Sequence, residues 1–345
     1  MRAAVLHGLG DLRVEEVPDP RAGPGEVVVS IEAALTCQTD VKAYRRGHPT
    51  YVRPPGVFGH EFAGRVAQLG HGVDGFSLGE RVFPSNSAPC GQCFYCMRGS
   101  YALCEDLQFL FGGFAEAIRV PARLVERNLH RLPDHLPVPV AALAEPLAAA
   151  VKAVSRADLG ANVRQGAEVA VLGAGALGVM LTACLAAEGA RVLVVDPHKE
   201  RLALAEQFGA AGTQVAAKDS SDVEAVRGWA NGGRGPDHVF EAVGSVAAWE
   251  LAVEMVRPGG TVHLLGGCPS ESRFSLRTFR PHYEEVRLQG SFHHDPAMVR
   301  RALGLLATGL QPWELLLGPQ VALGELAAVL DGSLHADASK VVVRP

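Results

Sequence analysis

The stretch EVAVLGAGALGVMLTACLAAEGARVLVVD, residues 168–196, decides the fold of the second half of the chain. It begins with a β-prone run, passes through closely spaced glycines, continues as an apolar helical segment and ends in a second β-prone run. The apolar part from Val169 to Ala187 approaches the ~20 residues that span a bilayer, but the glycines interrupt it. A buried strand, a tight turn and a helix explain the pattern better than a membrane span.

The glycines fit G-x-G-x-x-G between a strand and a helix, which is typical of dinucleotide binding. Gly173 permits the tight turn, Gly175 lets the backbone approach a pyrophosphate, and Gly178 lets the helix pack on the strand. Asp196 ends the next strand, where a carboxylate accepts hydrogen bonds from ribose hydroxyls and repels a 2′-phosphate. We therefore predict NAD over NADP. Arg201 is a candidate to flank the adenine or tolerate a phosphate, with solvated helix surface as the alternative.

Outward from this stretch, strands and helices alternate from about 150 to 292, which predicts an α/β domain with a doubly wound parallel sheet. Residues 1 to about 125 carry short strands between Gly and Pro turns, which predicts a β-rich, barrel-like domain. The tail is too short for its own core, so we expect it to return to the first domain. The predicted domains are 1–148 with 293–345, and 149–292.

Four cysteines lie close together in PCGQCFYCMRGSYALCED, at positions 90, 93, 96 and 104. Two-residue gaps let successive thiolates converge on one tetrahedral ion at ~2.3 Å, and four thiolates leave no position for a substrate. Cys90, Cys93, Cys96 and Cys104 therefore predict a structural zinc site. An iron–sulfur cluster is the alternative, because it also uses four cysteines.

The composition is that of an ordinary globular protein, with 345 residues, 48% hydrophobic and 20% charged. The net charge is −5 and the basic residues form no long run, so we expect no nucleic-acid partner. The first residues include Asp and Glu and lack the apolar run of a signal peptide. We expect a cytoplasmic protein that binds no membrane.

Further candidates are scattered, and none is persuasive alone: Cys37, His60 and Glu145. Together with the cysteine lobe and GAGALG, the elements Cys37-x-Thr39-Asp40, GHEFAG at 59–64 and AEPLA at 144–148 occur in a familiar order. In this the chain resembles the zinc-dependent medium-chain dehydrogenases, in their sorbitol, polyol and threonine dehydrogenase branch. The resemblance implies a GroES-like β domain beside a Rossmann domain, with the active site in the cleft between them.

The resemblance also implies roles for single residues. Cys37 and His60 correspond to ligands of a catalytic zinc, and Glu61 and Glu145 to the carboxylates that complete its shell or alternate in it. Asp40 would accept from the ring N–H of His60 and fix its tautomer. Thr39 would hydrogen-bond the substrate oxygen and begin a proton relay to water. Lys42 stands where the family often has His, so the resemblance assigns no residue to the outer half of that relay. His293 and His294 are expected at the surface or in a hinge.

The resulting prediction is an enzyme with two zinc ions per chain that transfers a hydride between NAD and a secondary alcohol. The small-molecule substrate is expected to be a polyol, a sugar or an amino alcohol such as threonine, and the assembly a homodimer or homotetramer. A zinc-free NADPH-dependent enone or quinone reductase, and a non-catalytic protein that binds nucleotide and zinc, are the alternatives.

Overall fold

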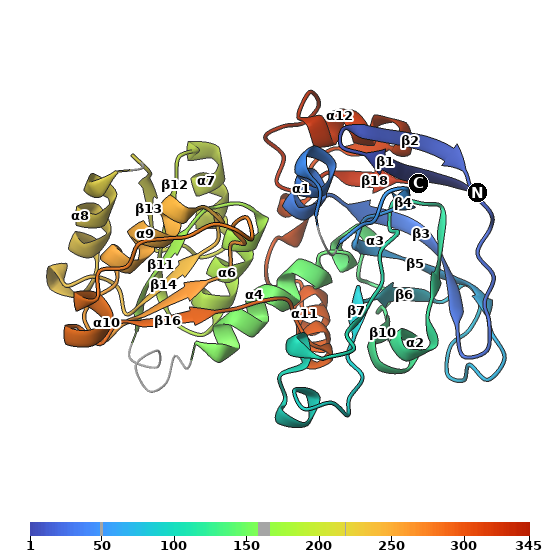
Figure 1. Ribbon diagram of the computed structural model, residues 1–345, viewed down its shortest axis with the longest axis horizontal. Helices are drawn as coiled ribbons and strands as arrows, with labels where there is room; N and C mark the ends of the chain where they lie inside the picture. The colour runs from blue at the N-terminus through green and yellow to red at the C-terminus, as the bar shows by residue number, and fades with distance from the viewer. Residues whose placement is uncertain (49–50, 158–165, 218) are drawn as a thin grey trace. The chain divides into compact units, whose positions relative to one another are not determined.

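The computed structural model describes residues 1–48, 51–157, 166–217 and 219–345 (Figure 1). The chain divides into two compact units. Unit 1 consists of Met1–Ala148 and His294–Pro345, and unit 2 consists of Ala149–His293. Helix α4 (Ala144–Arg156) carries the chain from the first unit into the second.

Unit 1 is built on a seven-stranded sheet with the order β10-β6-β5-β3-β18-β17, in which β9 also pairs with β3. Its strands are β3 (Val27–Leu35), β5 (Glu61–Leu69), β6 (Arg81–Pro84), β9 (Ala117–Val120), β10 (Leu129–Arg131), β17 (Gln320–Ala322) and β18 (Val342–Arg344). Two smaller sheets contain β1 (Arg2–Gly8), β2 (Asp11–Glu16) and β4 (Gly56–Val57), and β7 (Ser87–Ala88) with β8 (Gln108–Phe109).

Helices are short in this unit. They are α1 (Gln38–Arg46), α2 (Ala122–Asn128), α3 (Val138–Ala141), α11 (Pro296–Ala307) and α12 (Leu326–Asp331). Single turns of 3-10 helix occur at η1 (Cys96–Arg98), η2 (Tyr101–Leu103), η4 (Trp313–Leu316) and η5 (Leu323–Glu325). The predominance of strands agrees with the β-rich first half predicted from its turn pattern.

The core of unit 1 forms around β3, whose apolar residues are mostly buried. Three phenylalanines of this core, Phe58, Phe62 and Phe114, are each 0% exposed. β3 pairs antiparallel with β5 and with β18, where Val342 lies opposite Leu35. The C-terminal segment thus adds β18 and β17 to the sheet that contains β3 and β5.

Unit 2 contains a six-stranded sheet with the order β13-β12-β11-β14-β15-β16, and every neighbouring pair is parallel. Its strands are β11 (Glu168–Leu172), β12 (Arg191–Asp196), β13 (Gly212–Val215), β14 (His238–Glu241), β15 (Thr261–Leu264) and β16 (Arg287–Gly290). Its helices are α6 (Ala176–Ala187), α7 (Lys199–Gln207), α8 (Ser220–Trp229), α9 (Val246–Met255) and α10 (Phe279–Tyr283), with a 3-10 turn η3 (Asn231–Gly233). The predicted doubly wound parallel sheet is confirmed.

The stretch 168–196 forms β11, a glycine loop, α6 and β12, as its pattern predicts. Val169, Ala170 and Val171 are each 0% exposed, which is why this strand reads as a continuous apolar run rather than an alternation. Among the described residues, only the helical stretch Val138–Arg156 has the length and composition to cross a membrane. Because 83% of its most apolar 18 residues are buried inside the protein, ordinary core packing accounts for its composition.

Candidate active site

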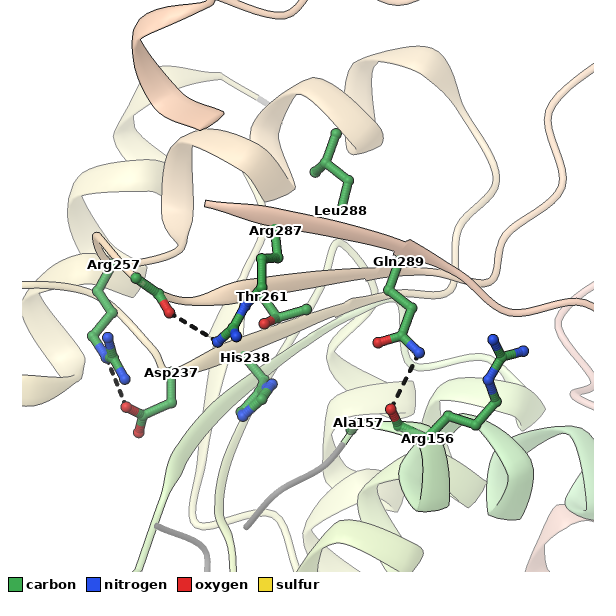
Figure 2. Close-up of a pocket in the computed structure, with 10 residues that line it drawn as sticks. Arg156, Ala157, Asp237, His238, Arg257, Thr261, Arg287, Leu288 and Gln289 are labelled. Atoms are coloured by element: carbon green, nitrogen blue, oxygen red, sulfur yellow. Dashed lines mark hydrogen bonds and ion pairs between the residues drawn. The ribbon is translucent and has the colours of Figure 1, made fainter. Parts of the chain in front are cut away.

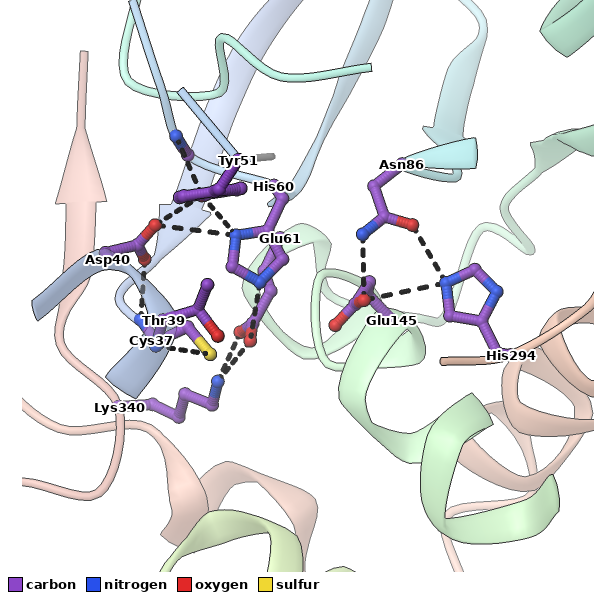
Figure 3. A network of polar contacts seen from close by, with 11 residues as sticks. Cys37, Thr39, Asp40, Tyr51, His60, Glu61, Asn86, Glu145, His294 and Lys340 are labelled. Atoms are coloured by element: carbon purple, nitrogen blue, oxygen red, sulfur yellow. Dashed lines mark hydrogen bonds and ion pairs between the residues drawn. The ribbon is translucent and has the colours of Figure 1, made fainter. Parts of the chain in front are cut away.

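Three potential metal ligands from two separate segments meet inside unit 1 (Figure 3). The ligand atoms of Cys37, His60 and Glu61 all lie within 4.8 Å of one another. His60 and Glu61 are buried, and Cys37 is half-buried. A thiolate, an imidazole nitrogen and a carboxylate are donors that hold Zn²⁺ in catalytic sites, where three protein ligands leave one position open. The donor set therefore fits a catalytic zinc.

The register of the main sheet brings the two segments side by side. Leu35 at the end of β3 lies opposite Glu61 at the start of β5, and Cys37 follows as the N-cap of α1. The Cys37 sulfur accepts a hydrogen bond from the Thr39 N–H at 3.5 Å, and the Asp40 carboxylate accepts one from the Cys37 N–H at 2.8 Å. This capping box fixes the orientation of the Cys37 side chain at the start of α1. Thr39 is half-buried beside it (Figure 3).

Tyr51, which sequence reasoning missed, links His60 to Asp40. Its hydroxyl contacts both Asp40 Oδ1 and His60 Nδ1, and accepts from the Gly59 N–H at 3.2 Å. Because a carboxylate only accepts, the hydroxyl donates to Asp40 and the His60 Nδ1–H donates to the hydroxyl. Asp40 Oδ1 itself lies 3.4 Å from His60 Nδ1. Asp40 thus acts on His60 mainly through Tyr51, and the His60 Nε2 atom lies on the side of Glu61, 3.9 Å from Oε1.

A buried cation, Lys340, lies beside the three candidate ligands. It stands two residues before β18, is 4% exposed, and its ammonium contacts both oxygens of the Glu61 carboxylate. Burial lowers the pKa of Lys340, but Glu61 and Cys37 outweigh burial and raise that pKa, so the ammonium stays charged. Sequence reasoning missed Lys340, which is 279 positions from Glu61 along the chain.

The same cation acts on Cys37. Burial raises the pKa of the Cys37 thiol, yet Lys340 and then His60 lower it further than burial raises it, and the pKa is about 7. A substantial fraction of the sulfur is therefore thiolate near neutral pH. Thiolate is the form of cysteine that binds metal ions.

Glu145, the fourth predicted ligand, lies apart from the group of three. It occupies the first turn of α4, and its Oε1 accepts from Asn86 Nδ2 at 2.9 Å. His294 Nε2 lies 3.5 Å from the same oxygen and 2.9 Å from Asn86 Oδ1 (Figure 3). The expectation of a surface position for His294 is wrong, because the residue is 1% exposed. The alternative of a hinge position agrees with the boundary of the two units, which falls between His293 and His294. Burial raises the pKa of Glu61 and Lys340 opposes that rise, while the charges of Cys37 and, to a smaller extent, Glu145 add to it.

The four remaining predicted ligands form a second group in unit 1. The sulfurs of Cys90, Cys93, Cys96 and Cys104 lie within 4.8 Å of one another, with Cys90 to Cys96 and Cys93 to Cys104 each at 3.9 Å. Tetrahedral Zn²⁺ at ~2.3 Å from each sulfur spaces the sulfurs about 3.8 Å apart. Backbone N–H groups of Cys96 and Glu105 lower the pKa of Cys93 to about 6. The geometry therefore fits an ion held by four thiolates.

The glycine loop of unit 2 leaves room for an anion at a helix N-terminus. Gly173 has a φ of 97°, a conformation that favours glycine. A Cβ on Gly178 would lie 1.8 Å from the Gly173 carbonyl oxygen, whereas a Cβ on Gly175 would meet nothing within 4 Å. Gly175 is the N-cap of α6, with no side chain capping the helix. The first N–H groups of α6 are thus available to a pyrophosphate, which fits a dinucleotide.

Asp196 ends β12 beside this loop and is 5% exposed. Its Oδ2 accepts from the Ala174 N–H at 2.8 Å, so the carboxylate also braces the loop. Its Oδ1 accepts from the N–H of His198 and pairs with the His198 ring. Arg201 lies in the first turn of α7 and is half-buried.

A cavity of about 550 Å³ lies at the amino ends of strands in the unit 2 sheet (Figure 2). It is lined in part by the first residues of three neighbouring strands, His238, Thr261 and Arg287. Arg257 is paired with Asp237 at 2.7 Å, and Arg287 donates to the Gly259 carbonyl at 3.2 Å. In a parallel sheet the glycine loop follows the carboxyl ends of the strands, so this cavity is separate from the dinucleotide loop, and none of the predicted zinc ligands lines it.

Comparison with known proteins identifies the family. The alcohol dehydrogenase GroES-like domain matches residues 23–134, and the zinc-binding dehydrogenase domain matches residues 176–308. The sorbitol dehydrogenase of Bacillus subtilis (strain 168) is 30% identical over 100% of this chain and 97% of its own length. The chain belongs to the zinc-dependent medium-chain alcohol and polyol dehydrogenase family.

Two further relatives of this family extend the comparison. The L-threonine 3-dehydrogenase of Pyrococcus furiosus is 36% identical over 74% of this chain and 72% of its own. A crystal structure of a zinc-binding dehydrogenase from Sinorhizobium meliloti 1021, bound to NADP, has a TM-score of 0.90 and 30% identity, covering 100% of this chain and 99% of that one.

The predicted family and fold class are therefore confirmed, and the chain is an oxidoreductase that acts on CH–OH groups. Its cofactors are zinc, which the two ligand groups fit, and a nicotinamide dinucleotide.

Proposed function

We propose that the chain oxidises a secondary hydroxyl of a polyol, a sugar or an amino alcohol such as threonine to the ketone, and catalyses the reverse reduction. NAD is the proposed hydride acceptor. The observation that carries the proposal is the convergence of Cys37, His60 and Glu61 on one buried point of unit 1. Relatives named for sorbitol and for L-threonine support the substrate class.

Cys37, His60 and one carboxylate would hold the catalytic zinc, and the four-cysteine group would hold the structural zinc. Glu61 is the proposed resting carboxylate ligand, because its oxygen is within 4.8 Å of the other two donors. When bound, the catalytic zinc lowers the pKa of the alcohol as a Lewis acid, while the nicotinamide takes the hydride.

The protein groups around this site prepare it for that chemistry. The chain from His60 Nδ1–H through Tyr51 to Asp40 would keep the ring proton on Nδ1 when zinc is bound, so that Nε2 could donate its lone pair to the ion. Burial and the Asp40 charge raise the pKa of Tyr51, so its hydroxyl stays protonated and the chain of hydrogen bonds persists. Thr39 would accept the substrate's hydroxyl proton and pass it toward water.

The two carboxylates each have a partner that holds them when they are not ligands. Lys340 pairs with Glu61, and Asn86 donates to Glu145 at 2.9 Å. Exchange of one carboxylate for the other would therefore move each side chain between two defined positions rather than release a buried charge without a partner.

Unit 2 is proposed as the NAD-binding Rossmann domain and unit 1 as the catalytic domain with both zinc sites. Gly173, Gly175 and Gly178 would receive the pyrophosphate, and Asp196 the adenosine ribose, with Arg201 nearby. We also propose that the protein is cytoplasmic and assembles as a homodimer or homotetramer.

A test combines metal analysis with a screen of NADH formation from alcohols, polyols, sugars and amino alcohols. We expect two zinc ions per chain and sustained NADH formation from at least one member of the proposed substrate classes. Cys37→Ala should abolish turnover while NAD affinity stays nearly intact, because the glycine loop does not involve Cys37. Cys268→Ala, a cysteine outside both ligand groups, is the control and should retain activity.

Turnover by Cys37→Ala at the wild-type rate would contradict the assigned roles. A protein without zinc that reduces enones or quinones with NADPH would also contradict them.

A further inference from the structure

The carboxylate of Asp196 is already engaged by three donors. Oδ2 accepts from the Ala174 N–H at 2.8 Å. Oδ1 accepts from the His198 N–H and pairs with the His198 ring nitrogen Nδ1, each at 2.9 Å. Because the carboxylate only accepts, Nδ1 carries the ring proton and donates to Oδ1.

A carboxylate offers roughly four lone-pair positions, two on each oxygen. His198 fills both positions on Oδ1, and Ala174 fills one on Oδ2. About one acceptor position is therefore left for a coenzyme. The two adjacent hydroxyls of a ribose can both donate to Asp196 only if the His198 ring moves away.

A substitution of His198 should leave the fold intact. His198 is the N-cap of α7, a position where Ser, Thr, Asp and Asn usually cap the helix, but its side chain makes no capping bond. The side chain is 51% exposed, while that of Asp196 is 6% exposed. The ring thus lies at the rim of the site and acts on Asp196 rather than on the helix.

We infer that His198 is a specificity-determining residue that reduces the preference of this chain for NAD over NADP. Its ring N–H occupies a lone pair that a ribose hydroxyl would otherwise use, and it partly shields the charge that repels a 2′-phosphate. The inference rests on the proposed coenzyme role of Asp196. It differs from a purely supportive role, in which the ring would orient Asp196 for NAD and its removal would weaken NAD binding.

The test measures the dissociation constants of NADH and NADPH by titration of the zinc-loaded enzyme. His198→Ala should bind NADH more tightly and NADPH more weakly, so that the ratio of the two constants moves toward NADH by about tenfold, the worth of one hydrogen bond to a charged group. His198→Asn should keep the wild-type ratio, because its amide nitrogen occupies the place of Nδ1. His282→Ala, an exposed histidine of α10, is the control.

His198→Met, which fills space but donates no hydrogen bond, separates the loss of the donor from the loss of volume and should behave like His198→Ala. An unchanged ratio in both donor-free variants, or a shift toward NADPH, would overturn the inference. A wild-type enzyme that binds neither coenzyme would instead overturn the proposed function of the loop, and with it the premise of this inference.

Discussion

Replacing Tyr51 with Phe removes one oxygen atom from the buried chain that joins His60 to Asp40. The His60 Nδ1–H then loses its acceptor, and Asp40, which is 0% exposed, keeps the Cys37 N–H at 2.8 Å. A buried donor left without a partner costs about 1–3 kcal/mol. Loss of a group that orients a ligating histidine typically weakens metal binding about 10–100-fold, which is the same range of free energy.

The lower end of that range is expected here. Asp40 Oδ1 lies 3.4 Å from His60 Nδ1, so a small shift of either side chain can restore a direct hydrogen bond. We therefore predict that Tyr51→Phe weakens zinc binding at the Cys37 and His60 site by about tenfold, within the range for such orienting groups. The four-cysteine site, which Tyr51 does not contact, should be unaffected.

The assay is zinc retention per chain during dialysis against graded concentrations of a chelator. Tyr44→Phe is the matched control, because Tyr44 is also buried in unit 1 and its hydroxyl donates to the Gly10 carbonyl at 3.1 Å, away from the ligands. Tyr51→Phe should release one zinc at lower chelator concentration than the wild type and the control. The reasoning is refuted if Tyr51→Phe retains both ions like the wild type, or if Tyr44→Phe loses one equally early.

Three other predictions concern the loop, the cysteine lobe and acid stability. Gly178→Ala should lower the free energy of unfolding by a few kcal/mol in denaturant titrations, since its Cβ would lie 1.8 Å from a carbonyl oxygen; Gly175→Ala should leave stability unchanged but weaken NAD binding, and equal stability losses would contradict this. Cys93→Ala should lose the structural zinc and lower the melting temperature, and a metal-replete variant of wild-type stability would count against the site. Burial lowers the pKa of His263 to about 3 from 6.5, so the contribution of this residue to the free energy of unfolding is undiminished above pH 6.5 and becomes unfavourable as the pH falls toward 3, because the unfolded chain binds the proton first. His263→Phe, which can keep the stacking on Phe240, should flatten that decline, and an unchanged acid limb would contradict it.

Features that depend on contiguous residues could be predicted from the sequence. The glycine loop follows from backbone constraints within six residues, because the positive φ of Gly173 and the missing Cβ of Gly178 are needed in any chain that makes this turn. The cysteine lobe is likewise local, since two-residue gaps keep the sulfurs within reach of one ion. The geometry of both motifs is therefore set by residues close together in the sequence.

Contacts that depend on sheet register and on the return of the tail could not be predicted. Lys340 reaches Glu61 only because the C-terminal strand pairs with β3, and His294 reaches Asn86 across 208 positions. Tyr51 has no motif around it that signals a hydrogen bond to His60. The pairing of His198 with Asp196 is a choice of side-chain rotamer, which neither the spacing nor the strand pattern specifies.

The most direct test of the central claim is an anomalous difference map, recorded at the zinc absorption edge, from crystals of the zinc-loaded protein. The account predicts two peaks per chain, one among the four cysteine sulfurs and one bounded by Cys37 Sγ, His60 Nε2 and a glutamate oxygen. A single peak at the cysteine lobe, with Cys37 and His60 bound to nothing in a preparation that turns over substrate, would contradict it.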